Sequence, residues 1–360
     1  MQFERIEVTN VRVLTSIRLH AEPGMNLVYG ANGSGKSSLL EAINLLSRAR
    51  SFRTRRLKDV ITRGSDHLQV AATVLTDDQR HIASGIERSH SETRIKYNGD
   101  VVRLMSDQVR NIPVLLLAPE SQGLLTDTPK ERRRWLNWLM FHVEPGYLST
   151  WSQYQKAMRH RNLLLRSGAS PVEVVGWERS MSVLAEDMVT SSRSMLEKLQ
   201  QQFVNELQAV MPGAVKIQYE GGWDETQPLD EALAQSRKAD MRCGFTRRGP
   251  HRADTLFYYD GHFAGSVLSR GQAKLYMIAL LLAQSCVVQQ CTGTRPVILI
   301  DDVFAELDNG ARERMANRLA EMEAQSFITS ADSNMQAYCT GLFHVEQGRI
   351  EKYTMAEAEE

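Results

Sequence analysis

The stretch Gly30–Ser37, which reads GANGSGKS, constrains this chain more than any other part of the sequence. It matches the pattern G-x-x-x-x-G-K-[ST]. The apolar run Asn26–Tyr29 precedes it, and Ser38–Leu46 repeats apolar residues at helical spacing after it. A strand, a glycine-rich turn and a helix start together point several backbone N–H groups at one position, which suits a phosphate group. The sequence therefore predicts an α/β fold with a phosphate-binding loop.

Each residue of this loop has a candidate role toward a nucleotide. The glycines permit the tight turn and the close approach of the backbone, and Lys36 is expected to reach the β- and γ-phosphates of ATP. The Ser37 hydroxyl is a candidate ligand for Mg²⁺. A chance glycine turn before a helix is the alternative, and the correct flanks argue against it. The predicted nucleotide contacts are Gly30, Ala31, Asn32, Gly33, Ser34, Gly35, Lys36, Ser37 and Ser38.

Bulk properties exclude several classes of protein. The 43 basic residues equal the 43 acidic ones, so a nucleic-acid surface requires an uneven distribution of charge. The N-terminus lacks a signal-peptide pattern, and the longest apolar stretch, Met277–Ala283, is far short of a membrane span. The 4 cysteines form no C-x-x-C pair, which is typical of reduced thiols. We expect a cytoplasmic protein with no membrane partner.

Strand patterns occupy both ends of the chain. Asn98-Gly99 and Asp260-Gly261 are hairpin turn signals, the second flanked by expected strands at Leu256–Tyr259 and Phe263–Leu268. Other expected strands cover residues 3–18, 26–29, 68–75, 81–88, 93–98, 112–117, 297–300 and 326–329.

Long helices are expected in the middle of the chain. Thr128–Glu131 and Ser170–Glu173 each carry a hydroxyl N-cap, a proline and a glutamate that can close a capping box. The first signal predicts a helix that ends near Gly146, and a second helix is expected to follow it as far as about Gly168. The other signal predicts a helix from Ser170 to about Val210, about 60 Å long. A further helix is expected over residues 269–290. We expect an ATPase lobe from 1–118 and 292–360, and a mainly helical lobe over 119–291.

The expected strand at 297–300 runs directly into Asp301-Asp302. An apolar strand that ends in a carboxylate is the Walker-B arrangement, in which an aspartate holds Mg²⁺. We assign that role to Asp301. Asp302 stands where such ATPases usually place a glutamate that orients or deprotonates the attacking water, so Lys36 and Asp302 are the candidate catalytic residues. An ordinary polar strand end is the alternative.

Leu268–Gln272 reads LSRGQ and resembles the LSGGQ signature of ABC-type ATPases. Ser269 is expected to cap the following helix, so its hydroxyl and the next N–H groups form a second anion site. The resemblance implies that Ser269, Gly271 and Gln272 bind the ATP held by a second copy, which gives an ATP-dependent homodimer. Residues 305–308 resemble the D-loop. Thr329-Ser330 departs from the family pattern, because many ABC enzymes carry a switch histidine there.

The whole chain resembles the RecF family of recombination-mediator ATPases, which are related to SMC heads. The resemblance implies an ABC-type P-loop ATPase head, with mixed sheets and helices, plus a mainly helical second lobe. The matching segments are Ile6–Arg12, Gly30–Ile43, Arg50–Thr54, Ala118–Glu120, Pro129, Arg132-Arg133, Arg248–Asp254, Ser269–Gln272 and Asp301–Asp308.

Family membership implies slow ATP hydrolysis, binding of duplex or gapped DNA, and cooperation with RecO and RecR in loading recombinase. It also implies roles in replication-fork maintenance and the SOS response. Clusters of arginine give independent support for DNA, because basic side chains follow a phosphate backbone. A solvated surface or pairing with an internal acid is the alternative for each cluster. The candidate DNA contacts are Arg53, Arg55, Arg56, Arg132 and Arg133.

Two other classes share some of these motifs. The nucleotide-binding subunit of an ABC transporter also has a P-loop, a signature and a Walker-B strand. Here residues 38–268 separate the P-loop from the signature, whereas transporter subunits are more compact. An ATPase-coupled nuclease would need a second acidic metal cluster, for which the sequence gives no pattern.

Overall fold

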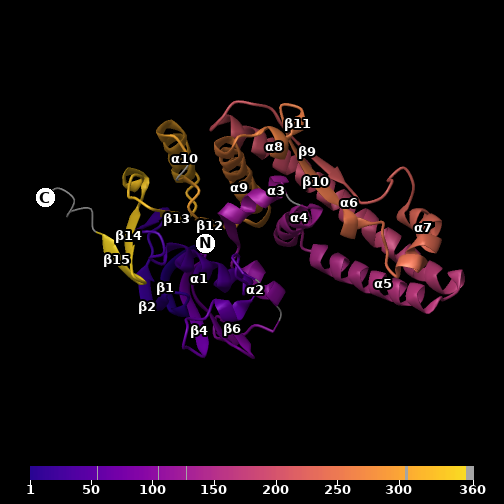
Figure 1. The fold of residues 1–360 in the computed structure, drawn as a ribbon, viewed down its shortest axis with the longest axis horizontal. Coiled ribbons are helices and arrows are strands. Elements are labelled where there is room, and N and C mark those ends of the chain that lie inside the picture. Colours follow the sequence, from indigo (N-terminus) through magenta and orange to yellow (C-terminus); the bar gives the residue numbers. More distant parts are fainter. Residues whose placement is uncertain (55, 104, 127, 305–306, 354–360) are drawn as a thin grey trace. The chain divides into compact units, whose positions relative to one another are not determined.

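A computed structural model describes residues 1–54, 56–103, 105–126, 128–304 and 307–353 (Figure 1). The chain divides into two compact units. Unit 1 contains Met1–Gln122, Glu206–Pro212 and Ser269–Glu360, and unit 2 contains Gly123–Asn205 and Gly213–Leu268.

The N-terminal part of unit 1 forms an antiparallel sheet of order β2-β1-β4-β5-β6-β7. Alternating buried and exposed positions in β1 and β4 show that one face of this sheet covers the core. Its strands are β1 Gln2–Val11, β2 Leu14–His20, β4 His67–Leu75, β5 His81–Ser89, β6 Thr93–Tyr97 and β7 Asp100–Val101.

The second sheet of unit 1 has the order β15-β14-β3-β13-β12-β8 and is parallel from β14 to β8. The central strands β3, β12 and β13 are almost wholly buried, and β12 is entirely apolar, as expected for a parallel sheet covered on both faces. Its strands are β3 Met25–Tyr29, β8 Val114–Leu117, β12 Val297–Ile300, β13 Ser326–Ser330, β14 Gly341–Glu346 and β15 Arg349–Tyr353.

Helix α1, Lys36–Arg48, joins the two sheets into one core, because it contacts strands of both. Leu39 and Ile43 of α1 are fully buried in a cluster that includes Val8 of β1 and Phe327 of β13. The other helices of unit 1 are α2 Met105–Asn111, α9 Arg270–Thr292 and α10 Asn309–Glu321.

Unit 2 consists of long helices and a sheet of order β11-β10-β9. Its buried centre includes Arg161, which donates to Glu178 and to Asp240 at 3.0–3.2 Å. The strands are β9 Val215–Glu220, β10 Asp254–Tyr259 and β11 His262–Phe263. The helices are α3 Gly123–Thr126, α4 Pro129–Val143, α5 Tyr147–Ser167, α6 Pro171–Gln208, α7 Leu229–Cys243 and α8 Ala264–Val267. Short 3-10 helices across both units cover Leu57–Asp59, Pro119–Gln122, Pro250–Arg252 and Gln336–Tyr338.

The long helix α6 belongs to unit 2 as far as Asn205, and its last turn belongs to unit 1. Glu206 is 1% exposed and accepts two hydrogen bonds of 2.7 Å from the guanidinium of Arg318 on α10. This ion pair raises the pKa of Arg318. Arg314 of α10 donates to the carbonyl of Val210 at 3.1 Å. The end of α6 is therefore fixed to α10.

Most expected elements are confirmed, and two details are wrong. Phe263–Leu268 is not a strand, because the chain turns into the short helix α8 after Phe263. Thr128 is the N-cap of α4 without a side-chain hydrogen bond, since Glu131 instead pairs with Arg134 on the next turn. Helix α9 packs against β8 and belongs to unit 1, and the expected boundary at 291 stays a prediction.

Among the described residues, α9 is the one helix whose length and apolar composition would allow it to cross a membrane. Within the structure, 72% of its most apolar window is buried. That burial is typical of a core helix.

Candidate functional site

The predicted phosphate-binding loop lies between β3 and α1, as the sequence indicates. Gly30 has φ 150, and a Cβ atom there would lie 2.2 Å from the carbonyl oxygen of Val345 in β14. Only glycine fits this position, because a side chain would push β14 away from the loop. Gly348, in the turn after β14, donates its N–H to the carbonyl of Ser34 at 2.8 Å. The loop is thus held in place from the side of β14.

Lys36, the first residue of α1, folds back over the loop. Its ammonium group donates to the carbonyl oxygens of Gly30 at 2.7 Å and Ala31 at 3.0 Å. Burial lowers the pKa of Lys36, and the charges of Asp302 and Asp301 act in the opposite direction. A cation held among backbone dipoles and near two carboxylates is the counter-charge that a phosphate chain requires.

The loop also contains an unsatisfied hydroxyl. Ser34 is 8% exposed, and its Oγ has no hydrogen-bond partner among the residues that the structure describes. A buried hydroxyl without a partner costs free energy, and a phosphate oxygen would supply the missing acceptor. The loop therefore fits the polyphosphate of a nucleotide.

Ser37 and Asp301 meet, although 264 positions separate them in the sequence. The Ser37 hydroxyl donates to Oδ1 of Asp301 at 2.8 Å. They are brought together because β3 and β12 both pair with β13 in parallel, so their carboxyl ends share one edge of the sheet. A hydroxyl and a carboxylate are oxygen ligands of the kind that Mg²⁺ prefers. These two residues fit the predicted metal position.

Thr329, at the end of β13, ties the two aspartates together. Its hydroxyl donates to Oδ1 of Asp301 at 2.7 Å and accepts the backbone N–H of Asp302 at 2.8 Å. Thr329 is 1% exposed, and its bond to Asp301 is buried, whereas its bond to the N–H of the exposed Asp302 is partly buried. The sequence marks this residue only as a departure from the switch histidine, and its contacts with the aspartates could not be read from the sequence.

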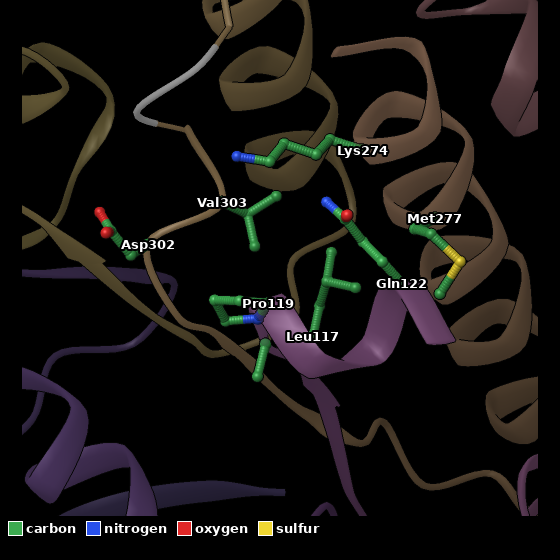
Figure 2. Close-up of a pocket in the computed structure, with 8 residues that line it drawn as sticks. Leu117, Pro119, Gln122, Lys274, Met277, Asp302 and Val303 are labelled. Atoms are coloured by element: carbon green, nitrogen blue, oxygen red, sulfur yellow. The ribbon is translucent and has the colours of Figure 1, made fainter. Parts of the chain in front are cut away.

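Asp302 is exposed and has a left-handed backbone with φ 50. It lines a pocket together with Gln122 and Lys274, two polar residues that sequence reasoning missed. Figure 2 shows Lys274 reaching from α9 over Val303, and the Asp302 carboxylate turned away from both polar side chains. Gln122 follows β8, which pairs in parallel with β12, and this pairing is the signal that could have placed it near Asp302.

Ser269 caps α9 as predicted. Its Oγ accepts the N–H of Gln272 at 3.3 Å, and the Gln272 side chain accepts the N–H of Ser269 at 3.0 Å. Ser269 and Gln272 are exposed and Gly271 is half-buried, so the helix start faces solvent. Of the expected D-loop, residues 305 and 306 lie outside the described residues, and Asp308 caps α10 through the N–H of Ala311.

The basic segment after α1 is connected to the P-loop helix. Glu41 of α1 is fully buried and binds the guanidinium of Arg12 at 2.9 and 3.0 Å. It also accepts the hydroxyl of Ser51, whose Oγ in turn accepts the N–H of Arg53 at 3.0 Å. Arg53 and Arg56 are exposed, whereas Arg55 lies outside the described residues.

The other two candidate DNA contacts are less available. Arg132 is 5% exposed and binds both carboxylate oxygens of Asp254 at 2.7 and 2.9 Å. It is therefore withdrawn as a DNA contact, because its guanidinium already pairs with an internal acid. Arg133 is half-buried and donates to the carbonyl of Ala253 at 2.8 Å.

Comparisons with known proteins agree with this geometry. The family model "RecF/RecN/SMC N terminal domain" matches residues 2–352. A protein named DNA replication and repair protein RecF from Stutzerimonas stutzeri is 38% identical and aligns over 97% of this chain and 97% of its own length. The protein of the same name from Azotobacter vinelandii is also 38% identical, over 97% of this chain and 98% of its own length.

Solved structures give the same result. A structure of the recombination mediator protein RecF with ATP in the RecFOR pathway aligns with a TM-score of 0.87 and 26% identity, covering 98% of this chain and 97% of that chain. An Smc head bound to the C-winged helix domain of ScpA aligns with a TM-score of 0.63 and 16% identity over 99% and 100%, which shows the same fold. The fold is that of an ABC-type ATPase head, and the chain belongs to the RecF family of DNA replication and repair proteins.

Proposed function

We propose that this protein binds ATP with Mg²⁺, forms a homodimer around the nucleotide on duplex or gapped DNA, and hydrolyses ATP slowly to release the dimer. The observation that supports this proposal is the hydrogen bond from Ser37 to Asp301, because it brings the end of the expected Walker-B strand to the loop that carries Lys36. The ATP-bound RecF structure that aligns with this chain supports the same ligand.

Each side chain of the site has a distinct task in this proposal. Lys36 leaves the carbonyls of Gly30 and Ala31 and binds the β- and γ-phosphates, while Ser37 and Asp301 hold Mg²⁺, which neutralises charge on the phosphates. Asp302 orients the attacking water or accepts its proton. Thr329 fixes the backbone of Asp302 and one oxygen of Asp301. An aspartate is one methylene shorter than the usual glutamate, which is consistent with slow turnover.

The dimer closes when the helix start at Ser269 meets the ATP of the partner copy. Its exposed hydroxyl and the N–H groups of the first turn of α9 can donate hydrogen bonds to a γ-phosphate there. ATP then acts as part of the interface, so dimerisation depends on nucleotide concentration. Membership of the family supports the further proposal that the protein is cytoplasmic, cooperates with RecO and RecR in loading recombinase at gaps, and acts at replication forks and in the SOS response.

Sedimentation with a non-hydrolysable ATP analogue, with and without duplex DNA, tests this proposal. The parent chain should sediment as a dimer with the analogue and as a monomer without it. Ser269→Arg should leave nucleotide affinity unchanged and remain a monomer, because the change blocks the interface and spares the P-loop. Ser180→Arg, at an exposed serine on α6, is the matched control and should dimerise. A parent chain that stays monomeric with saturating nucleotide would refute the dimer.

A further inference from the structure

An exposed aromatic ring lies among arginines on unit 2. Phe245, in the turn after α7, is 41% exposed. The guanidinium carbon of Arg252 lies 5.6 Å from the centre of its ring. Arg166, near the end of α5, donates its Nε to the carbonyl of Gly244 at 2.9 Å. Arg252 thus lies over the ring, and Arg166 lies at the carbonyl of the residue before it.

The basic surface continues from Arg252 to α4. Arg133 donates to the carbonyl of Ala253, the residue after Arg252, at 2.8 Å. Burial lowers the pKa of Arg133, and the positive charges of Arg252 and Arg132 lower it further, against the effect of Asp254. Arg133 and Arg252 are therefore close enough to repel each other. We name the surface formed by Arg133, Arg166, Phe245 and Arg252 the Phe245 surface.

Internal acids do not neutralise this surface. Asp254 binds Arg132 through both of its oxygens. Asp240 is fully buried, where it pairs with Arg161 and Arg247. Within the described part of the chain, Arg133, Arg166 and Arg252 have backbone or ring partners but no recorded ion pair. Their charges therefore remain available to a ligand from solution.

The combination of ring and guanidinium groups selects the chemistry of that ligand. Guanidinium groups bind phosphates, and an exposed aromatic ring stacks on a nucleic-acid base. In an intact duplex, both faces of each base are already covered by the neighbouring base pairs. A ring at this surface contributes only where a base is unpaired. An acidic protein segment would use the arginines and leave the ring without a specific partner.

We propose that the Phe245 surface binds a single-stranded segment of DNA, with Phe245 stacked on an unpaired base and the arginines on the adjacent phosphates. This inference deepens the proposed function, since it rests on the protein being a DNA-binding protein. It predicts a preference for gapped over intact DNA and assigns that preference to one side chain of unit 2.

Binding to fluorescent oligonucleotides in the presence of ATP tests the inference. The probes are a blunt duplex, the same duplex with a single-stranded gap, and single strands of DNA and RNA with the gap sequence. Phe245→Ala should weaken binding to the gapped duplex and the DNA strand by about 5- to 150-fold, the loss of one base stack. Binding to the blunt duplex should not change.

Matched variants separate the effect of the ring on binding from effects of folding and of charge. Phe245→Tyr keeps the ring face and should bind like the parent, whereas Phe245→Leu keeps apolar volume and should fail like Phe245→Ala. Arg252→Gln should reduce the slope of log affinity against log salt concentration by about 0.7 on the single strand.

The outcomes distinguish failure of this inference from failure of the proposed function. A parent chain that binds none of the DNA probes would overturn the proposed function and this inference with it. If the parent binds DNA but Phe245→Ala and Phe245→Leu bind every probe equally well, the base stack is refuted. In that case an acidic protein segment becomes the ligand to test. The inference would also be overturned if Phe245→Ala lost as much affinity for the blunt duplex as for the gapped duplex. Tighter binding of the RNA strand than of the DNA strand by the parent would overturn it as well.

Discussion

Replacing Thr329 by valine removes a hydroxyl with almost no change in shape. The hydroxyl donates to the charged Asp301 at 2.7 Å, and such a bond contributes about 1.5–3 kcal/mol. It also accepts the N–H of Asp302 at 2.8 Å, and losing that bond costs about 0.5–1 kcal/mol, since Asp302 is exposed and water can replace the acceptor. We expect Thr329→Val to destabilise unit 1 by about 2–4 kcal/mol.

Amide hydrogen exchange is the appropriate assay, because it reports on unit 1 directly. The 5 tryptophans all lie in unit 2, so their fluorescence would follow the other unit. Amides of β12 and β13 that exchange through opening of unit 1 should exchange about 30- to 1,000-fold faster in Thr329→Val. The concentration of Mg²⁺ needed for half-maximal ATP binding should also rise, because Asp301 is less well fixed.

Thr329→Ser is the control, since it keeps the hydroxyl and removes one buried methyl group, at a cost of about 1 kcal/mol. It should restore the Mg²⁺ dependence of the parent. The positioning role of the hydroxyl is wrong if the amides of Thr329→Val exchange as slowly as those of the parent. It is also wrong if the serine and valine variants lose the same amount of stability and need the same raised Mg²⁺ concentration for half-maximal ATP binding.

Lys36, Asp302 and His251 each give a further prediction. Lys36→Ala should weaken ATP binding by at least 10-fold in equilibrium titration, because the phosphates lose a charged donor, and unchanged affinity would rule this out. Asp302→Asn should slow ATP hydrolysis by about 10²- to 10⁴-fold and trap the ATP-bound dimer, and parental turnover would show that Asp302 has another role. Burial and the charges of Arg252, Arg133 and Arg161 lower the pKa of His251 to about 4, and neutral His251 accepts the hydroxyl of Tyr154 at 2.8 Å and donates to the carbonyl of Thr246 at 3.0 Å. Below its ordinary pKa of about 6.5 the unfolded chain gains a proton that the folded chain does not, so unit 2 should lose up to roughly 3 kcal/mol between pH 6.5 and 4. Tryptophan fluorescence in urea measures this loss, and His251→Gln should show a smaller pH dependence than the parent.

Local patterns predicted the elements well. Pro129, Pro171 and Ser269 mark the true starts of three long helices, since proline and serine act within one turn of the chain. The apolar run before Asp301 is the strand β12. The error at Phe263–Leu268 arose because the hairpin signal was extended over residues that the structure places in α8.

The features of the site that could not be predicted depend on contacts between segments that are distant in the sequence. Thr329 reaches Asp301 from 28 positions away, through the parallel pairing of β12 with β13. Arg132 belongs to an arginine cluster that predicted DNA contact, yet Asp254, 122 positions later, neutralises it. A charge cluster in sequence does not reveal which of its members pair internally, because the pairing is decided by packing.

The docking of α6 on α10 makes one guanidinium group decisive for the end of the helix. Glu206 is 1% exposed and receives both of its hydrogen bonds to Arg318 from that group. Without the guanidinium, a buried carboxylate would lose its counter-charge, at a cost of about 3–5 kcal/mol. The last turn of α6 would then gain more free energy from water than from α10.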